Sequence, residues 1–138
     1  MLPRRTKSSA AKRRRRVSGA TSVRVTGVLA QGTTIGASQE TVTIPADRIE
    51  TGELVFRVAG NFLGLANRDL LIVEPRPDGN AATGEFVIAT LHERAFLGRW
   101  WAKHGDRMVL GNDFHSVAQA PELQVLGAVT LIVREDSV

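Results

Sequence analysis

The sequence predicts a mainly β domain, and three observations carry this prediction. Apolar residues occur in short alternating or continuous runs, glycine and proline separate these runs, and no apolar stripe at helical spacing extends over ten residues. The 138 residues are 43% hydrophobic, which is enough for one domain with a modest core. We therefore expect a mostly antiparallel β fold that is closed or folded over itself.

The predicted strands follow one another along most of the chain. Val23, Val25 and Val28 alternate with polar residues, and Val42 and Ile44 do the same before Pro45 ends their run. Residues 76–84 are rich in turn-forming residues, and residues 102–107 contain a glycine, so we expect a loop and a hairpin connection there. The other predicted strands lie in "ELVFRVAG", "DLLIVEP", "TGEFVIATLH", "AFLGRWWA", "DRMVLGN" and "LQVLGAVTLIVRED".

Positive charge is concentrated at the N-terminus. Residues 1–16 hold eight of the 18 lysines and arginines and none of the 14 acidic residues, so the rest of the chain is mildly acidic. Residues 1–22 carry too little apolar surface to offset the entropy lost on ordering, which predicts a disordered basic tail (1–22) and one β domain (23–138). We expect residues 4–16 to contact nucleic acid without sequence preference, or an acidic partner, chiefly through Lys12, Arg13, Arg14, Arg15 and Arg16. A solubilising leader without a partner is the alternative.

Several classes of protein are excluded or disfavoured by composition. The chain has no cysteine, which excludes disulfides, thiolate catalysis and cysteine-ligated zinc. His92, His104 and His115 are not spaced as a metal-binding pair, so we expect no metal and no cofactor. No apolar run approaches the length of a membrane span, and no apolar segment of a signal peptide follows the basic start. We therefore expect no membrane contact and a cytoplasmic location.

Five segments, in order, resemble the self-cleaving domain of the LexA and UmuD family of serine–lysine peptidases. That family has a "G-x-S-M" turn, then "G-D-L-L-I-V", "G-D/E-x-V-V-A", "V-K-R-L", a hairpin and "L-x-V-x-G-x-V-x-x-V-x-R". The corresponding segments here are "VAGNFLGLANRDLLIVEPR", "TGEFVIATL", "FLGRWW", a hairpin and "LQVLGAVTLIVRE", with "VTGVLAQGTTIG" similar to the cleavage-site region. The resemblance covers residues 23 to about 135. It implies a folded β-sheet of the β-ribbon or β-clip type, as in the LexA C-terminal domain and signal peptidases.

The resemblance also implies that the catalytic pair is missing. Aligning the motifs places Phe62 at the serine position and Gly98 at the lysine position, and neither residue can transfer a proton or attack a carbonyl. The cleavage-site region corresponds to Ala30, Gln31 and Gly32, with Gln31–Gly32 in place of the scissile Ala–Gly bond. The turn between Gly60 and Asp69 is also shorter than the family's segment, by about three residues. In another serine peptidase, loss of one core catalytic residue lowers turnover by about a million-fold.

Two further predictions concern how the site is replaced. The Phe62 ring is predicted to fill the former cleft, in the space left by the missing side chain at Gly98. A relocated catalytic pair would have to use Lys103, which lies at the probable hairpin tip, with an isolated serine such as Ser38 or Ser116. Such a pair needs hydrogen-bond reach in a dry pocket, so we expect none.

The last two features suggest self-association. Trp100 and Trp101 are consecutive, so on a strand they point to opposite faces; one is predicted to pack in the core and the other to lie at a rim or an interface. The final strand is apolar on both faces, which at a sheet edge would need a cover. The resemblance implies a two-fold dimer through this region, and a fully buried central strand is the alternative.

The function expected from these observations is that of a non-catalytic LexA-like regulatory or dimerisation module. It would act in transcriptional or stress (SOS-type) regulation, as a homodimer that also contacts a regulatory protein or nucleic acid. Two alternatives remain. One is an active self-cleaving peptidase with an unrecognised pair, and the other is a small nonspecific nucleic-acid-binding protein.

Overall fold

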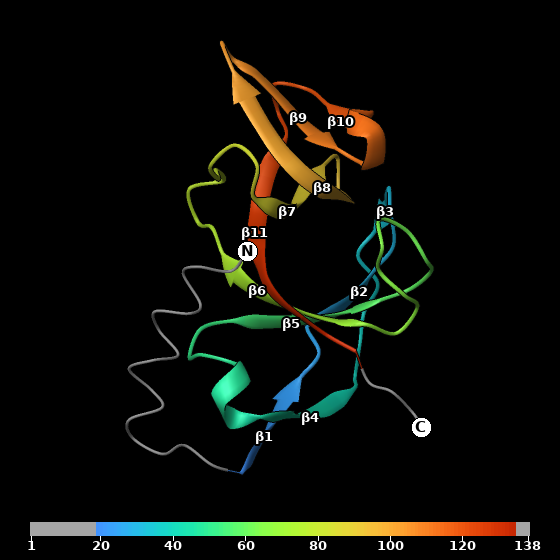
Figure 1. Cartoon of the computed structure of the whole chain (residues 1–138), viewed down its shortest axis with the longest axis vertical. Helices are drawn as coiled ribbons and strands as arrows, with labels where there is room; N and C mark the ends of the chain where they lie inside the picture. The colour runs from blue at the N-terminus through green and yellow to red at the C-terminus, as the bar shows by residue number, and fades with distance from the viewer. Residues whose placement is uncertain (1–18, 135–138) are drawn as a thin grey trace.

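The computed structural model describes residues 19–134, and most of these residues lie in β-strands (Figure 1). The mainly β prediction is therefore confirmed. The helical elements of this part of the chain are two single 3-10 turns, η1 (Ala46–Arg48) and η2 (Asn112–Phe114). The strands are β1 (Ala20–Arg24), β2 (Gly27–Leu29), β3 (Thr33–Thr34), β4 (Thr41–Pro45), β5 (Leu54–Val58), β6 (Leu70–Pro75), β7 (Phe86–Leu91), β8 (Arg94–Lys103), β9 (Asp106–Leu110), β10 (Ser116–Gln119) and β11 (Gln124–Val133).

Nine of the strands described for residues 19–134 form one sheet that curls round on itself. Its order is β10-β9-β8-β7-β11-β6-β5-β2, with β2 parallel to β5 and the other neighbours antiparallel. The short strand β3 pairs with the start of β8, and Val28 of β2 bridges to Gly36 just after β3. The segment from β2 to β3 therefore joins the two sides of the sheet, and Figure 1 shows the resulting ring of strands.

Three hydrophobic clusters fill this architecture. Strand side chains alternate between faces, so one set of residues points into the ring and another packs outside it. The first cluster lies below the ring in the view of Figure 1. There the two-stranded sheet of β1 and β4 packs against β5 and β6, through Val25, Val42, Ile44, Val55, Leu70 and Ile72. Above the ring, Trp100 and Val109 pack with Val87, Ala89, Ala118, Leu123 and Val125. The cluster inside the ring comprises Leu29, Phe56, Val58, Leu65, Leu71, Val73, Ile88, Ala95, Leu97 and Val129.

β11 lies at the centre of the sheet rather than at its edge. It pairs with β6 on one side and with β7 on the other, and register shifts interrupt both ladders. Val129 belongs to the cluster inside the ring, whereas Val125 belongs to the cluster above it. Its middle residues are covered on both faces, whereas Ile132 near its end is 43% exposed. The expectation of an edge strand is therefore wrong: β11 is a central strand, although not a fully buried one, and the dimer through this region stays a prediction.

The predicted boundary between tail and domain falls three residues too late. β1 begins at Ala20, and Thr21 and Ser22 pair with Ile44 and Thr43 of β4. Backbone pairing holds these polar residues in a strand, although their composition alone gave no sign of it. Residues 1–18 lie outside the described part of the chain, as do 135–138. No helix formed by residues 19–134 is both long enough and apolar enough to span a membrane.

Candidate functional site

The turn at the presumed nucleophile position is a tightly hydrogen-bonded hairpin between β5 and β6. At its tip, Phe62 and Leu65 exchange backbone hydrogen bonds of 3.2 and 2.8 Å. The two residues between them, Leu63 and Gly64, have φ angles of 55° and 79°, as a two-residue reversal of this kind requires. At the base of the loop, the Gly60 amide donates to Asn67 Oδ1 over 2.8 Å. The loop is therefore fixed by its own polar groups and presents no hydroxyl at its tip.

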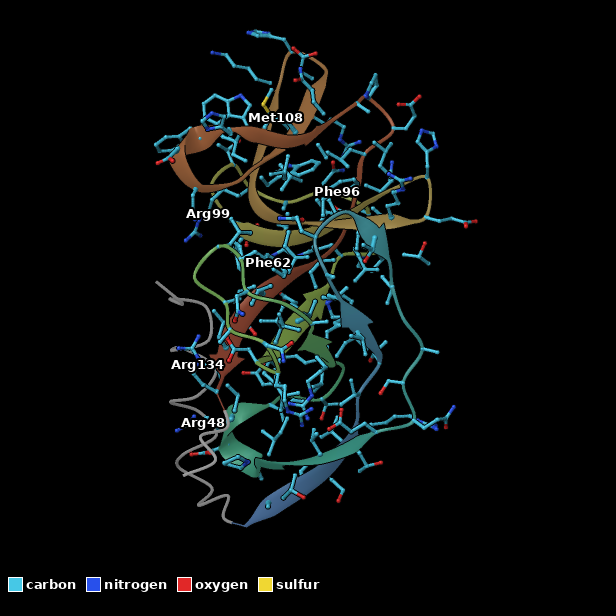
Figure 2. The ribbon with its side chains drawn as sticks, turned by 90° about the vertical axis from the view of Figure 1, so that its right-hand side faces the viewer. Arg48, Phe62, Phe96, Arg99, Met108 and Arg134 are labelled. Atoms are coloured by element: carbon cyan, nitrogen blue, oxygen red, sulfur yellow. The ribbon has the colours of Figure 1, made fainter. Side chains whose placement is uncertain are left out.

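The Phe62 side chain is partly buried and packs against the cluster inside the ring, which includes Leu97. Figure 2 shows Phe62 near the middle of the molecule, with Arg99 and Met108 above it in that view. An aromatic ring thus covers part of the core at residue 62. It supplies apolar contact and no nucleophile.

Gly98 is a glycine for a different reason from the one predicted. A Cβ at this position would overlap the Leu110 carbonyl oxygen and lie 2.7 Å from Val109 Cγ1. The three atoms nearest to it belong to Leu110 and Val109, and none belongs to Phe62. The backbone of β9 therefore occupies the space beside Gly98. The predicted compensation between the Phe62 ring and Gly98 is wrong, because strand pairing and not an aromatic ring excludes a side chain here.

The segment that resembles a cleavage site lies along β8, next to Gly98. The Gln31 carboxamide donates from Nε2 to the Leu97 carbonyl over 2.9 Å and accepts from the Leu97 amide at Oε1 over 2.7 Å. The Gly32 amide donates to the Ala95 carbonyl over 2.8 Å. The Gln31 side chain thus makes the two hydrogen bonds with Leu97 that the backbone of a neighbouring strand would make. β3 continues this pairing along β8. The structure brings Gln31 and Gly32 against β8 at residues 95–97, next to Gly98.

The far end of this segment is also fixed. Arg57 on β5 is 5% exposed, and its guanidinium binds the Glu40 carboxylate through Nε (3.2 Å to Oε1) and Nη2. The same guanidinium donates to the Arg68 carbonyl over 2.6 Å, so it links the 35–40 segment to the loop before β6. The Arg57 hydrogen bond to Glu40 lowers the pKa of that carboxyl, against the opposing effect of desolvation.

A second ion pair, between the buried Asp69 and the exposed Arg134, anchors the loop to the end of β11. Asp69 is 1% exposed, and its carboxylate accepts from Arg134 Nε over 2.9 Å, from Arg134 Nη2 over 2.8 Å and from the Ala66 amide over 2.8 Å. Arg134 also donates to the Gly64 carbonyl over 3.3 Å. The Arg134 hydrogen bonds, with that of Ala66, lower the pKa of Asp69 although burial opposes this shift. Sequence reasoning missed this pair, since an acidic residue before an apolar strand gives no sign of its partner 65 positions away.

The residues available for a relocated catalytic pair are dispersed. The Ser38 hydroxyl accepts from the Glu40 amide over 3.1 Å, and the Ser116 hydroxyl donates to the Ala118 carbonyl over 3.4 Å. Lys103 is exposed at the end of β8, whereas a general-base lysine works in a desolvated pocket. The shallow depression around Lys103 is lined by the hairpin residues 102–107 and Pro121, and it includes neither serine. Both serines already make local hydrogen bonds.

The remaining site predictions fall in two groups. His92, His104 and His115 are exposed, and within residues 19–134 no cluster of three or more histidines and carboxylates is arranged to hold a metal ion. The basic residues Lys12 to Arg16, predicted to contact nucleic acid, lie outside the described residues. The structure brings Gln31 and Gly32 next to Gly98 on β8, whereas Phe62 packs on the cluster inside the ring. No protein-family model and no curated protein matches this chain.

Proposed function

We propose that this chain is a non-catalytic regulatory module of the LexA type, whose hydrolytic pair has been lost and which acts through the partners it binds. One observation carries the proposal. The Gln31–Gly32 segment is docked along β8 beside Gly98, as a self-cleaving protein would hold its own scissile segment, and neither Phe62 nor Gly98 can supply a nucleophile or a base. Docking without chemistry supports a role in binding.

The geometry around the two replaced positions supports the loss of catalysis rather than its relocation. The loop tip at Phe62 is held by backbone hydrogen bonds, and the space beside Gly98 is filled by β9. A lysine at 98 would collide with β9. The resemblance in segment order supports transcriptional or stress regulation in the cytoplasm as the setting.

A second candidate function has its own supporting observation, the eight basic residues among the first 16. The guanidinium group of arginine can bind two phosphate oxygens at once, so this segment is suited to bind nucleic acid or an acidic protein surface. In the proposed module it is the arm that brings the β domain to such a partner. Taken alone, it would make the chain a nonspecific nucleic-acid-binding protein.

The proposal is tested by incubating the purified full chain at neutral and at alkaline pH and measuring its intact mass over time. The expected result is one species of unchanged mass. Two fragments with the masses of residues 1–31 and 32–138, formed at a rate independent of protein concentration, would contradict it. In that case the variants Lys103→Ala, Ser38→Ala and Ser116→Ala identify the relocated pair, because removing either member abolishes the fragments.

A further inference from the structure

β8, β9 and the loop after β9 carry partly or fully exposed apolar side chains that the proposed function does not use. Trp101 is 40% exposed and lies directly opposite Met108 in the antiparallel register, so their side chains are neighbours on one face. Leu110, two residues along β9 from Met108, shares that face. Phe114 follows in the loop at the end of β9 and is 83% exposed. We call Trp101, Met108, Leu110 and Phe114 the aromatic face; Figure 2 shows Met108 at the upper end of the molecule.

The backbone presents Phe114 to solvent at an energetic cost. Asp113 and Phe114 have φ angles of 61° and 59°, and two consecutive side-chain-bearing residues in the left-handed region are unfavourable, most of all for a bulky ring. Burial within the chain does not offset this cost, because the ring is almost fully exposed. Contact with a partner would offset it.

Charges around the aromatic face have both signs. Lys103 and Asp106 face each other across β8 and β9, Arg99 lies opposite Leu110, and Asp113 precedes Phe114. A nucleic-acid site requires a surface of mainly positive charge. A two-fold contact between identical surfaces instead needs both signs on the same patch, so that each copy supplies what the other lacks.

The sheet edge next to the aromatic face also lacks the features that discourage association. β10 is the edge strand beside β9, and its four residues include no proline and no charged residue to discourage pairing. The opposite edge, β2, is covered by the bridge from Val28 to Gly36. β11, which the sequence suggested as the dimer strand, pairs with β7 over residues 124–128 and with β6 over residues 127–133.

We infer that a second copy of this chain docks on the aromatic face, in a two-fold dimer centred on Trp101 and Phe114. Aromatic residues and methionine are enriched in such contacts, and a few buried aromatic anchors supply most of the binding energy. The inference deepens the proposed function, since a module without chemistry acts through association. The dimer would present two basic N-terminal arms to one partner.

The test is the molar mass of the full chain measured by light scattering during size-exclusion chromatography, over a series of concentrations. The wild-type chain is expected to reach the mass of a dimer. Trp101→Lys and Phe114→Asn are expected to raise the dimer dissociation constant about 30-fold or more, as loss of an interface anchor does. Asparagine tolerates the left-handed region, so Phe114→Asn removes the ring and keeps the loop. Circular dichroism checks that each variant is folded.

Ile132→Ser is the matched control, since Ile132 is also a large exposed hydrophobic residue, 43% exposed, near the far end of β11. It is expected to leave the dissociation constant unchanged. Three outcomes would overturn the inference: a wild-type chain that stays monomeric at all concentrations, a dimer unaffected by both face variants, or a dimer weakened most by Ile132→Ser. Each is independent of the fragment assay, so the surface and the absence of catalysis can fail separately.

Discussion

At the scale of single residues, Gly98 is specified by the strand beside it. Because a Cβ here would overlap the Leu110 carbonyl oxygen, even alanine must push β8 and β9 apart. Gly98→Ala is expected to lower the free energy of unfolding by about 1–3 kcal/mol, in the range of overpacked core sites. Urea unfolding of the two proteins measures this difference.

Gly36→Ala provides the control for that substitution. A Cβ at Gly36 would lie 3.5 Å from Val28 Cβ, which is an ordinary contact, and Gly36 does not have a positive φ angle. Its unfolding midpoint is expected to stay close to that of the wild type. Equal effects of the two substitutions would mean that the loss of glycine, and not the approach of β9, sets the cost.

The same residue marks a limit of sequence reasoning. Aligned motifs singled out positions 62 and 98 as the ones lacking catalytic groups, and this stays a prediction. The sequence could not show what each residue contacts. The neighbour of Gly98 is set by the register of β8 on β9, which depends on the hairpin turn between them, and not by the loop that carries Phe62.

At the scale of elements, the apolar runs were sufficient to predict most strands, because their alternation reflects burial on one face. β3 and β10 were missed since they are short, and β3 is exposed and polar. The position of β11 in the sheet was also beyond reach. A run that is apolar on both faces fits an edge strand with a partner as well as a central strand, and only the strand order distinguishes them.

The ion pair between the loop before β6 and the end of β11 makes stability depend on pH. The pKa of Asp69 is lowered below its ordinary value of 3.8, so the folded state favours the ionised carboxylate. Its contribution is fully present above the unfolded pKa and is lost as pH falls through the lower, folded pKa. Asp69→Asn is therefore expected to destabilise the protein at neutral pH and to flatten the loss of stability below pH 3.8.

Chemical unfolding at a series of pH values measures this effect, with Asp47→Asn as the control. Asp47 is an exposed aspartate in η1, away from β11. Its substitution is expected to leave the acid limb of the profile unchanged. A profile for Asp69→Asn that runs parallel to the wild type down to low pH would show that the carboxylate contributes nothing through its ionisation.

At the scale of the whole molecule, charge is divided between a basic N-terminal segment and a mildly acidic remainder. With eight basic residues in the first 16, binding of duplex DNA is expected to weaken steeply with salt. Each phosphate contact adds about 0.9 to the slope of log affinity against log salt, so the slope is expected to stay below about 7 in magnitude. Fluorescence anisotropy with labelled DNA measures it.

Deletion of residues 1–16 tests whether this basic segment carries the DNA contact. The deletion is expected to abolish DNA binding without altering the β domain. Circular dichroism and the unfolding midpoint check the second part of this expectation. Retention of DNA by the shortened chain, with an unchanged salt slope, would transfer the contact to the β domain.

The ring of strands is closed by only a few hydrogen bonds between the segment 31–34 and β8. Between β3 and β8 the join consists of two residue pairs, the Gly32 amide and one side-chain amide, whereas β11 pairs with β7 over residues 124–128 and with β6 over residues 127–133. Partial opening of a folded protein begins where the fewest bonds must break. We therefore expect the first partial opening of the native state to release residues 31–34, which would leave residues 94–97 of β8 with an unpaired edge while the remainder of the sheet stays intact.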